Sequence, residues 1–155
     1  MIHLPRDFRE FIQLLNEHNV SYVIVGGYAL AVHGYVRYTG DMDVFIALIP
    51  ENAENMLRAF HAFGLNTPDL HVALLLEEGN IIRIGSEPMR LEVLNKISGV
   101  DFEECYRNRQ TITIDGVAVN FVGYQELLKN KRATGRDKDR VDVAELLKRN
   151  ANNNA

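Results

Sequence analysis

Two aspartates separated by a single residue, Asp41 and Asp43, stand at the head of the apolar run Val44–Ala47. If this run is a β-strand, side chains two positions apart point to the same face of the sheet. Two anions held that close need a cation between them, and carboxylate oxygens suit a hard divalent ion such as Mg²⁺. The spacing therefore predicts a site for metal ions and for the nucleoside triphosphate (NTP) that they would accompany.

A glycine pair, Gly26 and Gly27, precedes the aspartates and follows the apolar run Tyr22–Val25. Glycines expose main-chain N–H groups to a phosphate without an obstructing Cβ. No Gly-Lys-Ser/Thr follows and the glycine spacing is not G-x-G-x-x-G, which disfavours P-loop kinases and dinucleotide-binding dehydrogenases. Arg37 and Thr39 stand close enough to the aspartates to reach triphosphate oxygens, although Arg37 could instead pair with an acidic residue.

Apolar periodicity predicts the elements that position these residues. The segment that starts at Pro68 matches helical spacing, but part of it could equally be a strand, Val72–Leu76. Two strands and a hairpin follow, and two helices finish the chain. The expected helices are Arg6–His18, Tyr28–His33, Pro50–Phe63, Pro68–Glu78, Phe102–Arg107, Tyr124–Thr134 and Asp137–Arg149; the expected strands are Tyr22–Val25, the strand with Asp41 and Asp43, Asn80–Gly85, Met89–Leu94, Thr111–Ile114 and Val117–Phe121.

Length and composition narrow the class of protein. We expect one domain over residues 1–149, because 155 residues with 46% hydrophobic content suffice for one core. Residues 150–155 are rich in asparagine, and we expect them to form a disordered tail. A net charge of −4 argues against a protein that coats long nucleic acids. The lone Cys105 excludes an internal disulfide, and no apolar stretch is long enough to span a membrane, so we expect a soluble cytoplasmic protein.

Two motifs together resemble a known family. The first is the strand, the pair Gly26-Gly27, a short helix and Asp41-Met42-Asp43; the second is the C-terminal segment Lys131–Asp142, which fits K-x-x-A-x-R-x-K-D-x-x-D. The combination resembles the minimal nucleotidyltransferases of the DNA polymerase β-like superfamily, some of which are related to toxin–antitoxin systems. The resemblance extends from about Tyr22 to Leu146.

The resemblance implies an α/β fold of the α+β type, with a mixed, twisted sheet flanked by helices and a C-terminal helical pair. It implies transfer of a nucleoside monophosphate from an NTP to a hydroxyl acceptor, with two Mg²⁺ ions, or Mn²⁺, on Asp41, Asp43 and a third carboxylate. Glu92 fills that third position, where the superfamily often has aspartate, and is either a metal ligand or the general base. Lys131, Arg136 and Lys138 either contact phosphate or form ion pairs with Asp137, Asp139 and Asp142.

Several alternatives stay open from the sequence. The acceptor is a small molecule, a protein hydroxyl or a tRNA end, and a homodimer or a partner protein could supply a missing wall of the cleft. A different class is a non-catalytic nucleotide-binding or antitoxin-like module with the same fold. We expect His33 to be a packing or capping residue, because no second ligand stands at metal-binding spacing, and Cys105 to be a small buried hydrophobe.

Overall fold

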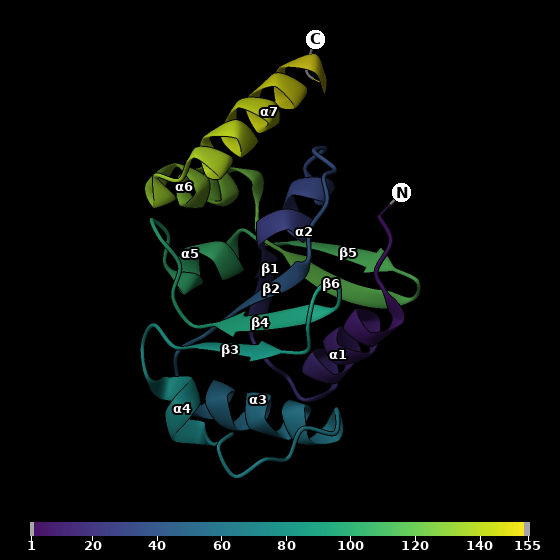
Figure 1. The fold of residues 1–155 in the computed structure, drawn as a ribbon, viewed down its shortest axis with the longest axis vertical. Helices are drawn as coiled ribbons and strands as arrows, with labels where there is room; N and C mark the ends of the chain where they lie inside the picture. The colour runs from purple at the N-terminus through teal and green to yellow at the C-terminus, as the bar shows by residue number, and fades with distance from the viewer. Residues whose placement is uncertain (1, 154–155) are drawn as a thin grey trace.

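The computed structural model describes residues 2–153, which form a six-stranded mixed sheet and the helices packed around it (Figure 1). The strand order is β3-β4-β2-β1-β6-β5. The strands are β1 (Tyr22–Val25), β2 (Asp41–Ile46), β3 (Ile81–Ile84), β4 (Arg90–Leu94), β5 (Gln110–Ile114) and β6 (Val117–Phe121). The helices are α1 (Arg6–Glu17), α2 (Gly26–Val32), α3 (Pro50–Ala62), α4 (Val72–Leu76), α5 (Phe102–Arg107), α6 (Tyr124–Thr134) and α7 (Asp137–Asn153).

The centre of the sheet combines antiparallel and parallel pairing. β1 is antiparallel to β2 and parallel to β6, and β2 is parallel to β4. The outer strands β3 and β5 pair antiparallel with β4 and β6. All of β1 is buried, which explains why its sequence is a continuous apolar run without alternation.

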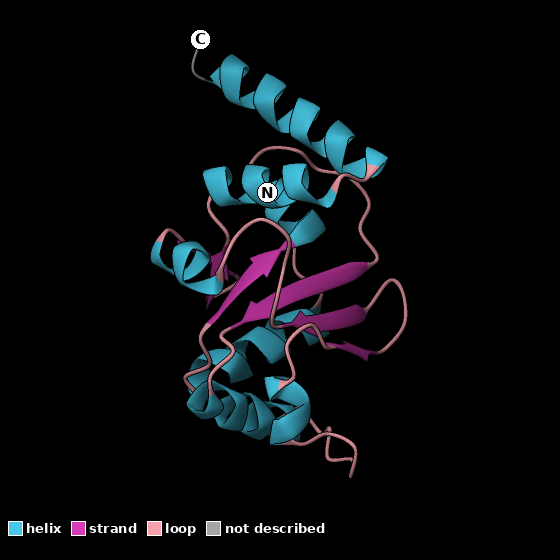
Figure 2. Cartoon of the chain, turned by 90° about the vertical axis from the view of Figure 1, so that its left-hand side faces the viewer, coloured by secondary structure: helices cyan, strands magenta, loops and turns pink. Residues whose placement is uncertain are grey.

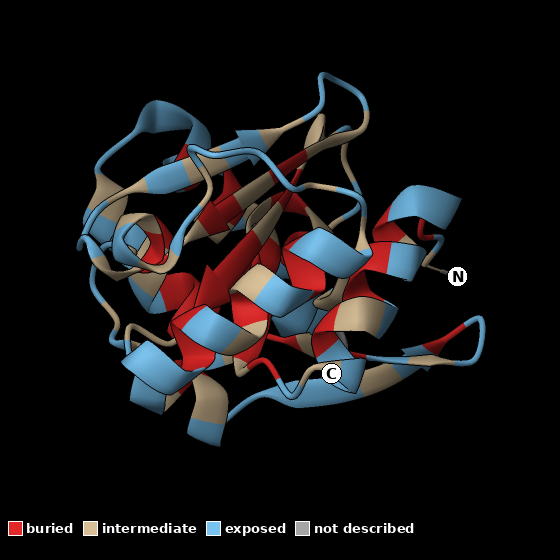
Figure 3. Ribbon diagram, turned by 90° about the horizontal axis from the view of Figure 1, so that it is seen from below, coloured by how far each residue is buried: buried red, intermediate tan, exposed pale blue. Residues whose placement is uncertain are grey.

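Helices lie on both sides of the sheet, with α1, α3 and α4 on one side and α6 on the other, and α7 packs against α6 (Figure 2). Helix α1 turns a buried stripe of Phe8, Phe11, Ile12 and Leu15 inward. Buried residues gather on the strands and on the sheet-facing sides of the helices (Figure 3). No helix within residues 2–153 is both long and apolar enough to cross a membrane.

The predicted fold class is confirmed, while several boundaries differ from the prediction. The helix predicted from Tyr28 begins at Gly26, because a left-handed φ of 71° at that glycine turns the chain straight from β1 into α2. The ambiguous segment after Pro68 forms only the short helix α4. Helix α7, predicted to end at Arg149, continues to Asn153, because no glycine or proline stops it; residues 154–155 of the predicted tail lie outside the described residues.

Candidate active site

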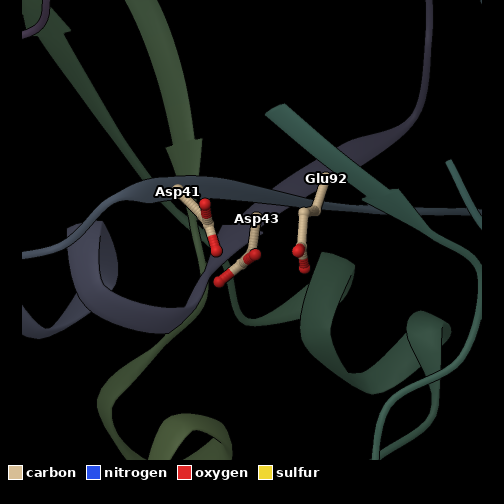
Figure 4. Close-up of side chains that lie close together, drawn as sticks. All are labelled: Asp41, Asp43 and Glu92. Carbon is tan, nitrogen blue, oxygen red and sulfur yellow. The ribbon is translucent and has the colours of Figure 1, made fainter. Parts of the chain in front are cut away.

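Three carboxylates meet on one face of the sheet. Asp41 and Asp43 lie on β2, and Glu92 lies on β4 directly opposite Asp43 in the parallel register. Their side chains point to the same side of the sheet (Figure 4), and one oxygen from each lies within 4.8 Å of the others. The structure thus brings together the carboxylates that the sequence predicts.

Strand alternation explains this arrangement. On β2 the partly buried aspartates alternate with Met42 and Val44, which are buried in the core. On β4 Leu91 and Val93 take the core positions, which leaves Glu92 on the open face. The two patterns match in register, so the polar faces of both strands form one surface.

The glycine pair provides the space that Asp43 occupies. A Cβ on Gly26 would lie 2.1 Å from Asp43 Oδ2, and a Cβ on Gly27 would lie 2.6 Å from the Thr39 side chain. Thr39 in turn donates its hydroxyl hydrogen to the main-chain oxygen of Asp41 at 3.0 Å. The glycines therefore allow the start of α2 to approach the aspartates, and Thr39 braces the entry to β2.

The electrostatics of Asp43 fit a cation site. Burial first, then the charges of Glu92 and Asp41 and a hydrogen bond with Glu92, raise the pKa of Asp43 to about 7, against a lowering by Lys131. A carboxyl group that keeps a proton up to about neutral pH because of burial and anionic neighbours gains from a cation that replaces the proton. The three carboxylates offer the hard oxygen ligands that Mg²⁺ or Mn²⁺ prefers, so the residues present fit a divalent ion.

Two arginines that the sequence interpretation did not include pair with the same carboxylates. Arg90 donates to both oxygens of Asp41, with Nε–Oδ1 at 2.7 Å and Nη2–Oδ2 at 3.0 Å. Arg83 donates from Nε to Glu92 Oε1 at 3.0 Å. The sequence could have indicated Arg90, because in a strand the residues at positions 90 and 92 point to the same face, and Arg90 therefore lies on the face of Glu92.

A cleft of about 690 Å³ opens over the carboxylates. All predicted site residues except Arg37 line it: Gly26, Gly27, Thr39, Asp41, Asp43, Glu92, Lys131, Arg136 and Lys138. Tyr38, which is 73% exposed, stands in the same lining. The cleft therefore joins the strand carboxylates to the basic residues of α6, of α7 and of the turn between them.

Some of the predicted phosphate ligands are committed to ion pairs. Arg37 holds the buried Asp142 of α7 through two hydrogen bonds of 3.0 Å. Lys131, itself only 5% exposed, lies 3.0 Å from both Asp139 and Asp142. The ion pairs that the sequence offered as alternatives for Arg37 and Lys131 are thus present, and those of Lys131 are buried.

The basic residues at the helix junction differ in exposure. Arg136 contacts Asp139 at 2.7 Å but its side chain is 68% exposed. Lys138 is exposed, lines the cleft and is absent from the ion pairs found among residues 2–153. Arg136 and Lys138 are therefore the basic side chains here with the most freedom to meet an anion.

Two residues that we expected to be structural are structural. The His33 ring nitrogen Nε2 lies 2.8 Å from the main-chain oxygen of Val122, which ties the end of α2 to the segment after β6. Cys105 is fully buried, and burial raises the pKa of its thiol to about 12. Neither residue lines the cleft.

Comparison with known proteins identifies the class. A candidate nucleotidyltransferase from Thermotoga maritima has a similar solved structure, with a TM-score of 0.62, 16% identity and coverage of 97% of both chains. An antigenic nucleotidyltransferase-like protein from Paracoccidioides brasiliensis has a TM-score of 0.53 at 18% identity, over 94% of this chain and 77% of that chain. At these identities the likeness shows the fold, which is that of nucleotidyltransferase-like proteins.

The family follows from the sequence match. Residues 4–151 match the family described as "Nucleotidyltransferase of unknown function (DUF6036)", and the chain belongs to this family. No curated protein matches the chain significantly. The predicted resemblance to nucleotidyltransferases is confirmed.

Proposed function

We propose that the protein transfers a nucleoside monophosphate from an NTP to a hydroxyl acceptor. One observation carries the proposal: Asp41, Asp43 and Glu92 converge within 4.8 Å of one another at a cleft large enough for a nucleotide. A cytoplasmic location is part of the proposal, since the chain has one cysteine and it is buried.

The carboxylates would hold the metal. Two Mg²⁺ ions, or Mn²⁺, bound there would neutralise the charge that builds on the phosphate oxygens and help to align the attacking and leaving groups. Asp41 and Asp43 supply ligands from β2, and Glu92 supplies the third from β4. The sheet fixes the main-chain positions of all three residues before substrate binds.

The phosphates would lie between the glycines and the basic end of the cleft. Gly26 and Gly27 let the main chain come close to an anion, and Arg136 and Lys138 add positive charge from the helix junction. We assign Arg37 and Lys131 to bracing of α6 and α7, because both hold the buried Asp142. Thr39 supports β2 through its bond to the Asp41 main chain.

Glu92 is also our candidate for accepting the proton of the acceptor hydroxyl, because it lies beside Asp43 at the cleft. Replacing Glu92 by Gln removes the basic oxygen and keeps the shape of the side chain. We expect turnover to fall at least about 100-fold, the usual size of a general-base contribution. Full turnover with unchanged metal affinity in Glu92→Gln would show that this role is wrong.

The test of the reaction uses NTPs labelled at either the α- or the γ-phosphate. With Mg²⁺ and a cell extract separated into protein, RNA and small-molecule fractions, we expect label from the α-phosphate, and none from the γ-phosphate, in one fraction. Asp43→Asn should abolish the labelling, and Asp69→Asn, at an exposed site outside the cleft, should leave it intact. Transfer of the γ-label would contradict nucleotidyl transfer.

The fraction that contains the label identifies the chemical class of the acceptor. Label in protein indicates a protein hydroxyl, label in RNA indicates a tRNA end, and label in the small-molecule fraction indicates a metabolite. A homodimer or a partner protein could present any of these acceptors. Labelled metabolite alone would exclude both polymeric acceptors.

One observation favours a second function, a non-catalytic nucleotide-binding or antitoxin-like module. Asp41 and Glu92 already carry arginine partners, so most of the negative charge of the site is balanced without a metal. Calorimetry with ATP, GTP, CTP and UTP, with and without Mg²⁺, separates the two functions. Metal-independent binding that is unchanged in Asp43→Asn would support the module and refute the catalytic assignment.

A further inference from the structure

Arg90 lies where its charge reaches two of the predicted metal ligands. It stands opposite Asp41 in the register of β4 with β2, on the same face as Glu92. Its guanidinium binds both oxygens of Asp41, at 2.7 and 3.0 Å, and its Nε is 3.7 Å from Glu92 Oε1. One cation therefore interacts with both Asp41 and Glu92.

The chemistry of this contact makes it a competitor for a metal ion. A planar guanidinium that binds both oxygens of a carboxylate is the strongest geometry for this pair. A divalent ion on Asp41 would share that carboxylate with a positive charge a few ångströms away, and like charges at this distance repel. Arg90 and a metal ion thus oppose each other at Asp41.

The surroundings of Arg90 offer it a second partner. Glu87, on the turn between β3 and β4, has Oε1 at 3.4 Å from Arg90 Nη2, and its side chain is 55% exposed. The Arg90 side chain is itself 31% exposed, so it is not locked in the core. The guanidinium can keep an anionic partner when it leaves Asp41.

We propose that Arg90 is a built-in counter-cation of the active site, which holds Asp41 in the metal-free protein and has to be displaced when a divalent ion binds. The inference rests on the proposed function, since it takes Asp41, Asp43 and Glu92 as metal ligands. It makes Arg90 a positioning residue that weakens binding of the metal alone. Metal then binds best when a nucleotide contributes further oxygen ligands.

The test measures binding of Mn²⁺ alone to the full chain, from the electron paramagnetic resonance signal of free Mn²⁺. We expect Arg90→Met to bind Mn²⁺ at least about fivefold more tightly than the unchanged protein, because a nearby positive charge is removed. Arg90→Lys, which keeps the charge but cannot bind both oxygens of Asp41, should fall between the two. Arg9→Met is the matched control, since Arg9 is 30% exposed and pairs with Asp115 away from the cleft, and should not change the affinity.

The outcomes separate this inference from the proposed function. Equal Mn²⁺ affinity in Arg90→Met, Arg90→Lys and the unchanged protein, with binding lost in Asp43→Asn, would overturn the role of Arg90 and leave the metal site in place. Absence of Mn²⁺ binding in every one of these proteins would overturn the metal site, and the inference with it. Circular dichroism spectra confirm that each variant is folded before its affinity is compared.

Discussion

Of the three carboxylates, Asp43 is the one whose negative charge is most unfavourable in the folded protein. Burial and, after it, the charges of Glu92 and Asp41 together raise its pKa to about 7. Arg90 and Arg83 pair with those two neighbours, whereas Asp43 has no ion pair among residues 2–153. A cation at this position would relieve a repulsion that the fold itself creates.

Replacing Asp43 by Asn should stabilise the metal-free protein at pH 8. The pKa of Asp43 is higher in the folded protein than its ordinary 3.8, so the unfolded chain loses this proton first as the pH rises. The resulting cost to the fold grows from about pH 4 to pH 7 and is fully present above pH 7. We expect a gain of about 1–3 kcal/mol in the free energy of unfolding at pH 8 and almost none near pH 4.

Urea unfolding in EDTA at pH 4 and pH 8 checks this prediction. Asp69→Asn, at an exposed position outside the cleft, should show no such difference between the two pH values. A loss of stability in Asp43→Asn of the same size at both pH values would mean that the carboxyl group is held by favourable contacts.

At the scale of elements, the junction between β1 and α2 determines where Asp43 can lie. We predict that Gly26→Ala weakens Mn²⁺ binding, because the added Cβ would lie 2.1 Å from Asp43 Oδ2 and push the carboxylate aside. Gly116→Ala is the matched control: Gly116 has a similar left-handed φ of 82°, but nothing lies within 4 Å of its Cβ position. Both variants should lose about 1–2 kcal/mol of stability from the positive φ, and only Gly26→Ala should lose metal affinity.

Titration of both glycine variants with Mn²⁺ measures their metal affinities and tests this prediction. Equal affinities in Gly26→Ala and Gly116→Ala would show that Asp43 can bind metal from another rotamer, and that the close approach of Gly26 serves the fold alone.

The junction of α6 and α7 depends on a buried carboxylate. Asp139 is fully buried and receives hydrogen bonds from Thr134, Lys131 and Arg136. Burial raises its pKa, but these three bonds outweigh burial and lower the pKa to about 2. The stabilisation from Asp139 is therefore present above about pH 4 and is lost as the pH falls from 4 to 2.

We predict that Asp139→Asn lowers the free energy of unfolding at pH 7 by about 2–4 kcal/mol, because it leaves the buried Lys131 with one anionic partner. Asp137→Asn, on the same helix, is the control: its side chain is 98% exposed and its pair with Arg140 is 3.5 Å long. Chemical denaturation at pH 7 and pH 2 measures both variants. The difference between Asp139→Asn and the unchanged protein should be mostly lost at pH 2, and a difference of the same size at pH 2 and pH 7 would contradict the ion-pair explanation.

At the scale of the whole molecule, the sheet order brings distant segments into one site. Glu92 meets Asp43 only because β4 lies beside β2 in parallel register. The sequence predicts the strands, the alternation on each and the need for a third carboxylate. Local patterns do not contain the register between strands, which follows from packing of the whole sheet.

The same reasoning explains what the sequence interpretation left open for Arg37 and missed for Arg90. Arg37 looks like a phosphate ligand in sequence because it precedes the aspartates, but its partner Asp142 lies on α7, far along the chain. Pairing of Arg90 with Asp41 likewise depends on the β2–β4 register. Contacts between residues distant in sequence determine which charges stay free, and single-sequence patterns do not report them.

The most direct test of the central claim is a crystal structure of the protein with a non-hydrolysable NTP and Mn²⁺, with the metal located by anomalous scattering. The proposal predicts an anomalous peak in contact with the carboxylates of Asp41, Asp43 and Glu92, next to the triphosphate. Arg90 should then have left Asp41. A nucleotide bound away from this cleft, or a metal ion that does not contact these carboxylates, would contradict the assignment of the active site.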